Sequence, residues 1–280
     1  MAEPTRDTLR VALAQMCSAD THAANIATVT KLAERAASEG AELLALPEVA
    51  GLMNRNFEVA KTQVVAAAED PFIVACQGLA AKHGLWIHTG STPVIGPDGR
   101  FLNHSTLIDF SGAIRAEYDK IHLFDVTLDG QKPIGESKRF APGGKAVLAD
   151  TTWGKWAMTI CYDLRFPHLY RMHAQAGASL IFIPSAFTVS TGQAHWEVLL
   201  RARAIEIGAF VLAAAQAGQH ADGRQTYGHS LAVDPWGKVL ADLGEDAPQM
   251  RILDLDLSRV EAARRQIPAW GADVAFTPPV

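Results

Sequence analysis

Residues 156–167 read WAMTICYDLRFP, and this stretch indicates both the fold and the chemistry of the chain. An apolar, β-prone run ends directly before Cys161, and polar residues follow as far as Pro167, which suits the first turn of a helix. A nucleophile between a strand and a helix lies at a sheet edge, where a substrate and a backbone N–H can reach it. We therefore predict a reactive thiol at Cys161, although most free cysteines are small buried hydrophobic residues.

Two further segments place a charged residue at the end of a strand-like run. Residues 41–48 read AELLALPE, in which a short apolar strand passes through a proline into Glu48. Residues 115–124 read RAEYDKIHLF, in which Lys120 has apolar neighbours at alternate positions. Taken singly, Glu48 could be a helix-start charge and Lys120 a solvated surface cation. Together with Cys161 they supply a general base, a cation and a nucleophile.

The contexts of these three residues resemble those of the nitrilase superfamily of carbon–nitrogen hydrolases. That family has Leu-Pro-Glu around its glutamate, Tyr-x-Lys-x-His-Leu-Phe around its lysine and Ile-Cys-Tyr-Asp-Leu-Arg-Phe-Pro around its cysteine. All three contexts are present here in the family's chain order, at Glu48, Lys120 and Cys161. The similarity extends over roughly residues 9–267 and includes the segments 183–187, 191–197, 201–206 and 227–230.

This resemblance implies a fold and an assembly. The implied fold is of the α/β class, a four-layer α-β-β-α sandwich with mixed sheets. We expect a single carbon–nitrogen hydrolase domain over residues 1–280, with its core at about 9–267 and an extended tail at 268–280. Because family members commonly dimerise through helical faces, a homodimer or larger homo-oligomer is expected, with the tail over a neighbouring subunit.

Hydrophobic periodicity separately predicts alternating strands and helices. The expected elements include strands at 10–16, 85–89, 180–183 and 210–214 and helices at about 71–82, 169–175 and 194–207. A first helix, capped by Asp20 or Thr21 and stopped by Gly40, joins two strands into a β–α–β start with parallel neighbours. We expect a hairpin turn at 97–99, and His195 at the opening of a helix.

Composition excludes several classes of partner. The chain of 280 residues has 25 basic and 30 acidic residues and a formal net charge of −5, so neither nucleic acid nor an anionic membrane surface is an expected partner. The N-terminus lacks a signal-peptide pattern, and we expect a cytoplasmic protein. The three cysteines and scattered histidines lack metal-ligand spacing, so we expect no metal and no cofactor. Cys17 and Cys76 are interpreted as core or near-core residues.

The chemistry of amide hydrolysis suggests a role for each residue. Cys161 attacks the carbonyl carbon, and the ammonium of Lys120 is expected to lower the pKa of the thiol. Lys120 and the backbone N–H of Tyr162 stabilise the oxyanion, and Glu48 gives a proton to the amine and then activates water. Glu136 matches a second family glutamate that orients the lysine or the water, although a loop glutamate faces solvent by default.

The substrate is predicted to be a small-molecule amide that carries a carboxylate. Arg165 could aim a planar guanidinium into the pocket, or it could form a structural salt bridge to Asp163 or to a helix end. Residues 166–236 are similar to the superfamily branch that contains deaminated glutathione amidase and ω-amidase. In that branch the residues matching Arg165, Phe187 and Thr191 contact an α-keto dicarboxylate-like group. The segment 51–56 is expected to line the pocket.

Three hydrolase activities and two non-hydrolytic roles remain open at this point. The resemblance favours hydrolysis of deaminated glutathione to 2-oxoglutarate and Cys-Gly. An ω-amidase acting on 2-oxoglutaramate is the nearest alternative, and an N-carbamoyl amine hydrolase is more distant. A non-catalytic ligand-binding protein or a thiol redox sensor on the same fold belongs to a different class, but neither needs Glu48 and Lys120 around the sulfur.

Overall fold

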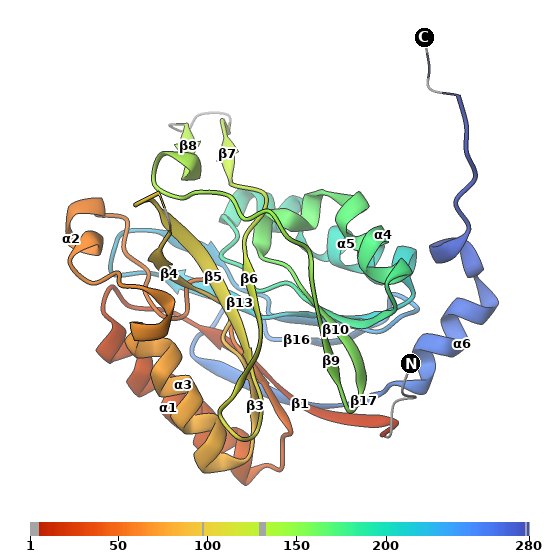
Figure 1. The fold of residues 1–280 in the computed structure, drawn as a ribbon, viewed down its shortest axis with the longest axis horizontal. Helices are drawn as coiled ribbons and strands as arrows, with labels where there is room; N and C mark the ends of the chain where they lie inside the picture. Colours follow the sequence, from red (N-terminus) through yellow and green to blue (C-terminus); the bar gives the residue numbers. More distant parts are fainter. Residues whose placement is uncertain (1–5, 97, 129–132, 278, 280) are drawn as a thin grey trace.

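The computed structural model describes residues 6–96, 98–128, 133–277 and 279, and within them two mixed β-sheets lie face to face (Figure 1). The strands of the first sheet are β1 (Thr8–Met16), β2 (Leu43–Ala45), β3 (Trp86–His88), β4 (Thr92–Ile95), β5 (Phe101–Ile108), β6 (Ile114–Asp119), β13 (Ala215–Gln219), β14 (Gln225–Tyr227) and β17 (Gln249–Asp256). Their order is β14-β13-β1-β2-β3-β5-β4, with β17 paired to β1 and β6 paired to β5. Strands β1 and β2 are parallel, as predicted for the β–α–β start.

The second sheet carries the strand that leads to Cys161. Its strands are β9 (Val147–Thr151), β10 (Gly154–Met158), β11 (Ala178–Phe182), β12 (Phe210–Ala213), β15 (Leu231–Val233) and β16 (Val239–Asp242). Their order is β16-β15-β12-β11-β10-β9, and the three central strands β10, β11 and β12 are parallel. A small separate pair consists of β7 (Asp125–Val126) and β8 (Ile134–Gly135).

Helices cover the outer faces of both sheets. Their bounds are α1 (His22–Ser38), α2 (Phe57–Lys61), α3 (Pro71–His83), α4 (Pro167–Gln175), α5 (Val189–Ile207) and α6 (Ser258–Gln266), with short 3-10 helices η1 (Ala67–Glu69), η2 (Glu136–Lys138), η3 (Cys161–Arg165) and η4 (Pro268–Gly271). Helices α1 and α3 pack on the first sheet, and α4 and α5 pack on the second (Figure 1). The expected four-layer sandwich is confirmed.

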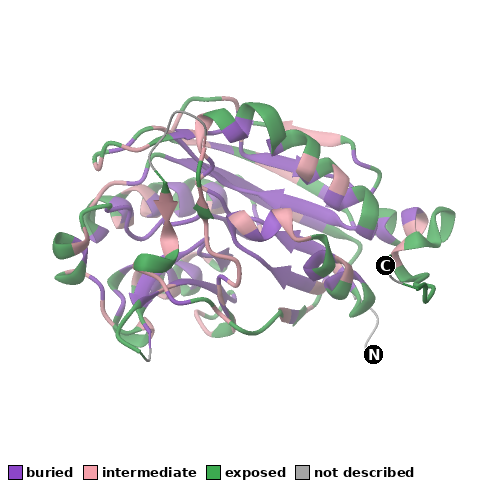
Figure 2. Cartoon of the chain, turned by 90° about the horizontal axis from the view of Figure 1, so that it is seen from above, coloured by how far each residue is buried: buried purple, intermediate pink, exposed green. Residues whose placement is uncertain are grey.

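The side chains of β1 show how the layers are held together. Alternate residues of a strand point to opposite faces of its sheet. Leu9, Val11 and Leu13 belong to the apolar core between the two sheets. Ala14 and Met16 belong to the core under α1 and α3. Figure 2 shows the buried strands in the interior and the exposed residues on the outer surfaces of the helices.

Capping differs between the first two long helices. Asp70 caps α3 by accepting hydrogen bonds of 3.0 Å from the backbone N–H groups of Phe72 and Ile73, and Gly84 ends the helix in a left-handed conformation. Thr21 occupies the N-cap of α1, but its side chain makes no capping hydrogen bond with the described residues. Asn25 binds the backbone of the preceding loop instead, so the prediction of a side-chain cap at Thr21 is wrong.

Two local predictions also need correction, the start of α5 and the burial of Cys17. Helix α5 begins at Val189 and not near residue 194, so His195 lies inside the helix and does not open it. The first turn of α5 contains Gly192, which weakens a helical pattern, and its lack of a side chain admits the ring of Tyr227. Cys17 is exposed, whereas Cys76 is fully buried as expected. The turn predicted at 97–99 joins the antiparallel strands β4 and β5, but Pro97 lies outside the described residues.

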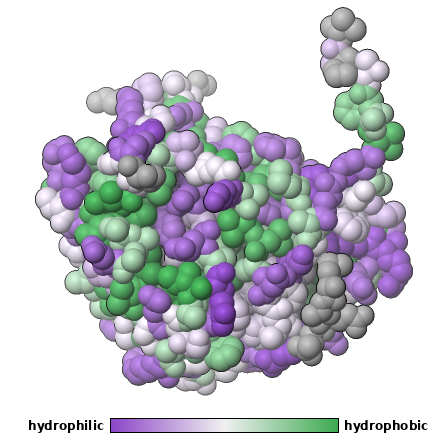
Figure 3. Space-filling view, in the orientation of Figure 1, coloured by the Kyte–Doolittle hydropathy of each residue, from purple (hydrophilic) through white to green (hydrophobic). Residues whose placement is uncertain are grey.

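The C-terminal segment leaves the body of the molecule after α6 and η4 (Figure 1). Figure 3 shows its described part standing clear of the surface, with some green, apolar residues in it. Val274 and Phe276 are 81% and 85% exposed. In the part of the chain that the structure describes, no helix is long and apolar enough to span a bilayer.

Candidate active site

Glu48 lies in a tight loop just beyond the end of β2. Gly90 allows this loop to approach the chain after β3, because a Cβ atom at Gly90 would lie 1.8 Å from the carbonyl oxygen of Pro47. The next residue, Val49, has a φ of 50°, a strained value for a β-branched residue. Glu48 is 5% exposed. The loop therefore fixes the carboxylate inside the protein at the cost of local backbone strain.

Every oxygen of the Glu48 carboxylate is hydrogen-bonded. Oε1 accepts hydrogen bonds of 2.9 Å from Asn103 Nδ2 and from Lys120 Nζ. Oε2 accepts a hydrogen bond of 2.8 Å from the backbone N–H of Ala186. These donors come from β5, from the end of β6 and from the loop after β11, so both sheets hold the same carboxylate. The geometry suits a group that stays in one place while it accepts and donates protons.

Lys120 directly follows β6, and its Nζ atom bridges two carboxylates. Nζ lies 2.9 Å from Glu48 Oε1 and 2.9 Å from Glu136 Oε2. The side chain is 2% exposed, and burial by itself disfavours its charged form. The carboxylates of Glu136 and Glu48 outweigh this penalty and raise the pKa of Lys120 well above its usual value. The two carboxylates therefore favour the charged ammonium form of Lys120.

Glu136 begins the short helix η2 and belongs to the site. Its Oε2 atom also accepts a hydrogen bond of 2.6 Å from the backbone N–H of Phe124, and its side chain is 14% exposed. The default interpretation of a solvent-facing loop glutamate is therefore wrong for Glu136. The contact with Lys120 matches the orienting position that the family resemblance implies.

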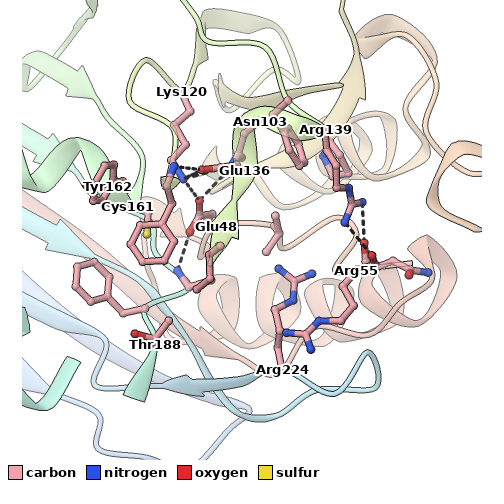
Figure 4. Close-up of a pocket in the computed structure, with 18 of the residues that line it drawn as sticks. Glu48, Arg55, Asn103, Lys120, Glu136, Arg139, Cys161, Tyr162, Thr188 and Arg224 are labelled. Carbon is pink, nitrogen blue, oxygen red and sulfur yellow. Dashed lines mark hydrogen bonds and ion pairs between the residues drawn. The ribbon is translucent and has the colours of Figure 1, made fainter. Parts of the chain in front are cut away.

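Cys161 stands at the junction of β10 and η3 in a conformation that few non-glycine residues adopt. Its φ is 48°, and its backbone N–H donates to the carbonyl of Pro184 at 2.9 Å. The thiol lies beside Glu48 and Lys120 in Figure 4, as predicted for the three residues. Asp163 accepts a hydrogen bond from the backbone N–H of Ile160 at 2.8 Å and so fixes the turn that carries the sulfur.

The protonation of Cys161 differs from the prediction made from Lys120 alone. Burial is the largest influence and raises the pKa of the thiol, and the negative charge of Glu48 raises it further. Lys120 lowers the pKa, but its effect is smaller, so the pKa of Cys161 is well above the usual value. The lowering effect expected of Lys120 is thus present, but burial and Glu48 set the net direction of the thiol pKa. In the resting site the sulfur is a thiol, and a base must remove its proton during attack.

Tyr162 follows the nucleophile at the start of η3. The first N–H groups of a helix have no acceptor within it, and the N–H of Tyr162 has no hydrogen-bond acceptor among the residues that the structure describes, so it can meet charge that develops near the sulfur. The Tyr162 ring packs edge-on against Phe124 and Phe166 and lines the cavity. His122 makes a hydrogen bond of 2.7 Å to Asp163 and so helps to hold the turn that carries Cys161.

The site opens into a cavity of about 250 Å³. Its lining includes Glu48, Asn103, Lys120, Glu136, Cys161, Tyr162, Phe187 and Thr191 and, from the segment 51–56, Leu52, Asn54 and Arg55. The expectation that this segment lines the pocket is confirmed. Figure 4 shows the Glu-Lys-Cys set at one end of the cavity and the guanidinium groups of Arg55, Arg139 and Arg224 at the other.

Arg165 adopts neither of the two arrangements considered from the sequence. It is not among the described residues that line the cavity, and Asp163 is bonded to other groups. The guanidinium of Arg165 lies 5.7 Å from the ring centre of Phe187 and 3.2 Å from Nδ1 of His195. Helix α5 begins early enough to place His195 within reach of this arginine. A role for Arg165 in direct substrate contact therefore remains a prediction that the cavity does not favour.

Sequence reasoning did not single out Asn103, Arg139 and Arg224 as cavity residues. It placed Arg55 in the cavity lining as part of the segment 51–56 but gave it no role. Asn103 carries no distinguishing signal in the sequence, because it is the first of four consecutive polar residues in β5. Arg139 and Arg224 follow no strand-end pattern and lie in separate loops. Only the tertiary fold brings them to one wall.

The cavity contains no obvious metal centre. Among the residues that the structure describes, no three His, Cys, Asp or Glu side chains are arranged to hold an ion.

Comparison with known proteins gives consistent matches over nearly the whole chain. Residues 10–265 match the family model described as carbon-nitrogen hydrolase. The chain is 39% identical over 261 residues to the deaminated glutathione amidase of Yersinia enterocolitica, which covers 92% of this chain and 90% of that protein.

Two solved structures are also similar. Saccharomyces cerevisiae Nit3, described as a member of branch 10 of the nitrilase superfamily, is 30% identical with a TM-score of 0.84, over 95% of this chain and 97% of that one. The C. elegans NitFhit protein is 36% identical with a TM-score of 0.87, over 96% of this chain and 66% of that longer one.

Proposed function

The chain belongs to the carbon–nitrogen hydrolase family, and from this premise we propose that it hydrolyses deaminated glutathione to 2-oxoglutarate and Cys-Gly. The chain is an amidase whose similar relatives include the deaminated glutathione amidases of Yersinia enterocolitica and Homo sapiens, each 39% identical to it. One observation carries the proposal: a buried carboxylate, a buried ammonium and a thiol meet at one end of a single cavity. This arrangement supplies the base, the oxyanion partner and the nucleophile of acyl transfer.

The first step follows from the protonation of the resting site. Glu48 takes the proton of Cys161 as the sulfur attacks the amide carbon, which explains how a thiol with a raised pKa can act as a nucleophile. The carbonyl oxygen gains negative charge, and Lys120 Nζ and the N–H of Tyr162 stabilise it. A donor of this kind typically contributes about 10²–10³ in rate.

The second half of the reaction returns the site to its starting state. Protonated Glu48 gives its proton to the leaving nitrogen, the carbon–nitrogen bond breaks, and a thioester remains on Cys161. Glu48, again a carboxylate, removes a proton from water as the water attacks the thioester. The acid leaves, and the proton returns to the sulfur. Glu136 keeps Lys120 in position through both halves.

The protonation of Cys161 also argues against the redox-sensor alternative. Sensor cysteines are exposed and have a low pKa, so that the thiolate reacts with oxidants. Cys161 is 7% exposed and has a raised pKa. Both properties favour a nucleophile that is activated only when substrate is bound.

The test is a comparison of two amides with the purified protein. We expect a higher kcat/KM for deaminated glutathione than for 2-oxoglutaramate, measured by release of 2-oxoglutarate. Faster turnover of 2-oxoglutaramate would replace the proposal with the ω-amidase alternative. Turnover of an N-carbamoyl amine alone would overturn both.

We also propose a single-domain homo-oligomer that works in the cytoplasm. The exposed apolar residues Val274 and Phe276 of the C-terminal segment support a second copy as their partner. The free cysteines Cys17, Cys76 and Cys161 suit a reducing compartment. Light scattering coupled to size exclusion tests the assembly. A monomer at micromolar concentration, or an unchanged oligomer after deletion of residues 272–280, would contradict the role of the segment.

A further inference from the structure

Three arginine side chains meet at the end of the cavity far from Cys161 (Figure 4). Arg55 precedes α2, Arg139 follows η2, and Arg224 precedes β14. These segments are distant in the sequence, and the reaction steps derived above use none of the three guanidinium groups. Their position on the wall of the substrate cavity therefore needs a separate explanation.

The protein holds two of these side chains, those of Arg139 and Arg224, in place. Arg139 donates from Nη1 to the carbonyl of Arg55 at 3.1 Å and from Nη2 to the carbonyl of Asn54 at 3.0 Å. Its guanidinium lies 5.4 Å and 5.8 Å from the ring centres of Phe57 and Phe140. The Nε atom of Arg139 is buried and has no acceptor among the described residues. A buried charged donor without a partner is costly, and a bound acceptor would remove that cost.

Arg224 is fixed by a different contact. Its Nε atom donates to Asp222 at 2.7 Å, and the Asp222 side chain is 2% exposed. The charges of Arg224 and Arg55 help to lower the pKa of Asp222 against the effect of burial. One carboxylate therefore stands beside three guanidinium groups at this end of the cavity.

The charges that line the cavity leave an excess of positive charge. Of the described lining residues, Arg55, Lys120, Arg139 and Arg224 are cationic, whereas Glu48 and Glu136 are carboxylates. Both carboxylates are paired with Lys120 at the opposite end. Burial, together with the nearby charge of Arg224, lowers the pKa of Arg139. An anionic ligand would compensate this repulsion, and a planar guanidinium binds a carboxylate through two parallel hydrogen bonds.

The position of Glu48 assigns this anion to one half of the substrate. Glu48 lies between Cys161 and the arginines in Figure 4. Since Glu48 protonates the leaving nitrogen, the amine half of the substrate extends past Glu48 toward the arginines. We infer that Arg55, Arg139 and Arg224 form a subsite for a carboxylate on the amine half of the amide. This inference rests on the proposed amidase function, and it makes the enzyme selective for amines that are themselves amino acids or peptides with a free carboxyl end.

The test uses two substrates that differ only at the far end. Deaminated glutathione has a free glycine carboxylate, and its C-terminal carboxamide replaces that charge by a neutral group. We expect Arg139→Gln and Arg224→Gln each to raise KM for the free acid by about 10- to 100-fold, the range for a lost hydrogen bond to a charged group. We expect kcat and the KM for the carboxamide to change by less than about threefold. The matched control is Arg100→Gln, which removes an exposed arginine outside the cavity.

A second variant and a binding measurement make the outcomes distinct. Arg139→Lys keeps the charge and should restore part of the affinity, which separates charge recognition from damage to the loop. Calorimetry with the Cys161→Ala protein should show tighter binding of the free acid than of the carboxamide. If wild-type enzyme hydrolyses both substrates with equal KM, or if the arginine variants weaken both equally, the subsite is wrong while the amidase function stands. If neither is hydrolysed, the proposed function fails, and calorimetry still decides the subsite.

Discussion

The ammonium nitrogen of Lys120 lies 2.9 Å from Oε1 of Glu48, and both side chains are almost completely removed from solvent. Glu136 approaches the same nitrogen at 2.9 Å, so one cation balances two carboxylates inside the protein. Such a group is stable only as a whole, because removal of one partner leaves uncompensated buried charge. The residues that perform the chemistry are thus also residues on which the stability of the fold depends.

Replacement of Lys120 by Met should lower both the stability of the fold and the rate of amide hydrolysis. Without the ammonium, Glu48 and Glu136 repel each other, and we expect the free energy of unfolding to fall by roughly 3–5 kcal/mol. Amide turnover should fall by at least about 10²–10³-fold, because the oxyanion loses its cationic partner. Urea denaturation and kcat measure the two effects. The control is Lys82→Met, which removes an exposed lysine and should change neither quantity appreciably. Full stability in Lys120→Met would contradict the ion-pair argument.

Replacement of Glu48 by Gln should block both halves of the reaction. The amide cannot take the proton of Cys161, and it cannot activate water, so kcat should fall by about 10²–10⁴-fold. Glutamine has the same shape but only one acceptor oxygen, so it keeps either the hydrogen bond from Asn103 or the one from Ala186. Because Lys120 still pairs with Glu136, the protein should remain folded. Mass spectrometry of the protein during turnover should detect no thioester. Rapid accumulation of a thioester would instead restrict Glu48 to the hydrolysis step.

Much of the fold could be predicted from the sequence because the responsible signals are local. The strand before Cys161, the helix between Pro71 and Gly84 and the parallel β–α–β start depend on periodicity, capping and turn residues within short windows. The start of α5 could not be predicted in this way, because Gly192 weakens the helical pattern and the reason for this glycine is the distant ring of Tyr227. The family resemblance, and not periodicity, supplied the number of layers.

The candidate site, too, could be predicted from the sequence only where the signals are local. Glu48, Lys120 and Cys161 each follow a strand in a recognisable motif, and the structure brings them together. The raised pKa of Cys161 depends on burial and on a carboxylate from another sheet, so the nearby lysine alone could not predict the net direction. No sequence motif marks the three arginines at the far end of the cavity, since Arg139 interacts with backbone carbonyl groups more than eighty residues away in the sequence.

The raised pKa of the thiol predicts slow and strongly pH-dependent alkylation of Cys161 in the free enzyme. Only the thiolate reacts with iodoacetamide, and the usual pKa of 9.0 is exceeded here because of burial and Glu48. The rate should therefore rise throughout pH 7–9 without a plateau. Mass spectrometry of the Cys161 peptide in a Cys17→Ser background measures it without interference from the exposed cysteine. A plateau below pH 8 would show that the resting sulfur is already a thiolate.

A last prediction concerns acid stability and the loop that carries Glu48. His88 is buried, stacks on Phe182 and accepts a hydrogen bond of 3.3 Å from the backbone N–H of Gly90, the residue in close contact with Pro47. Burial lowers the pKa of His88 from 6.5 to about 3. Between pH 6.5 and about pH 3, His88 therefore binds a proton in the unfolded chain but not in the folded chain. The free energy of unfolding consequently decreases as the pH falls through this range.

At pH 4.5, which is two units below the unfolded-state pKa of 6.5, His88 should lower the free energy of unfolding by about 2–3 kcal/mol. Urea denaturation at a series of pH values should show this slope. His88→Asn removes the titrating group and should flatten the slope between pH 6.5 and pH 4, even if the variant is less stable at neutral pH. Part of the slope should remain, because the pKa of buried His173 is lowered to about 4. The exposed control His168→Asn should keep the full slope; equal slopes in the two variants would mean that His88 is protonated in the fold.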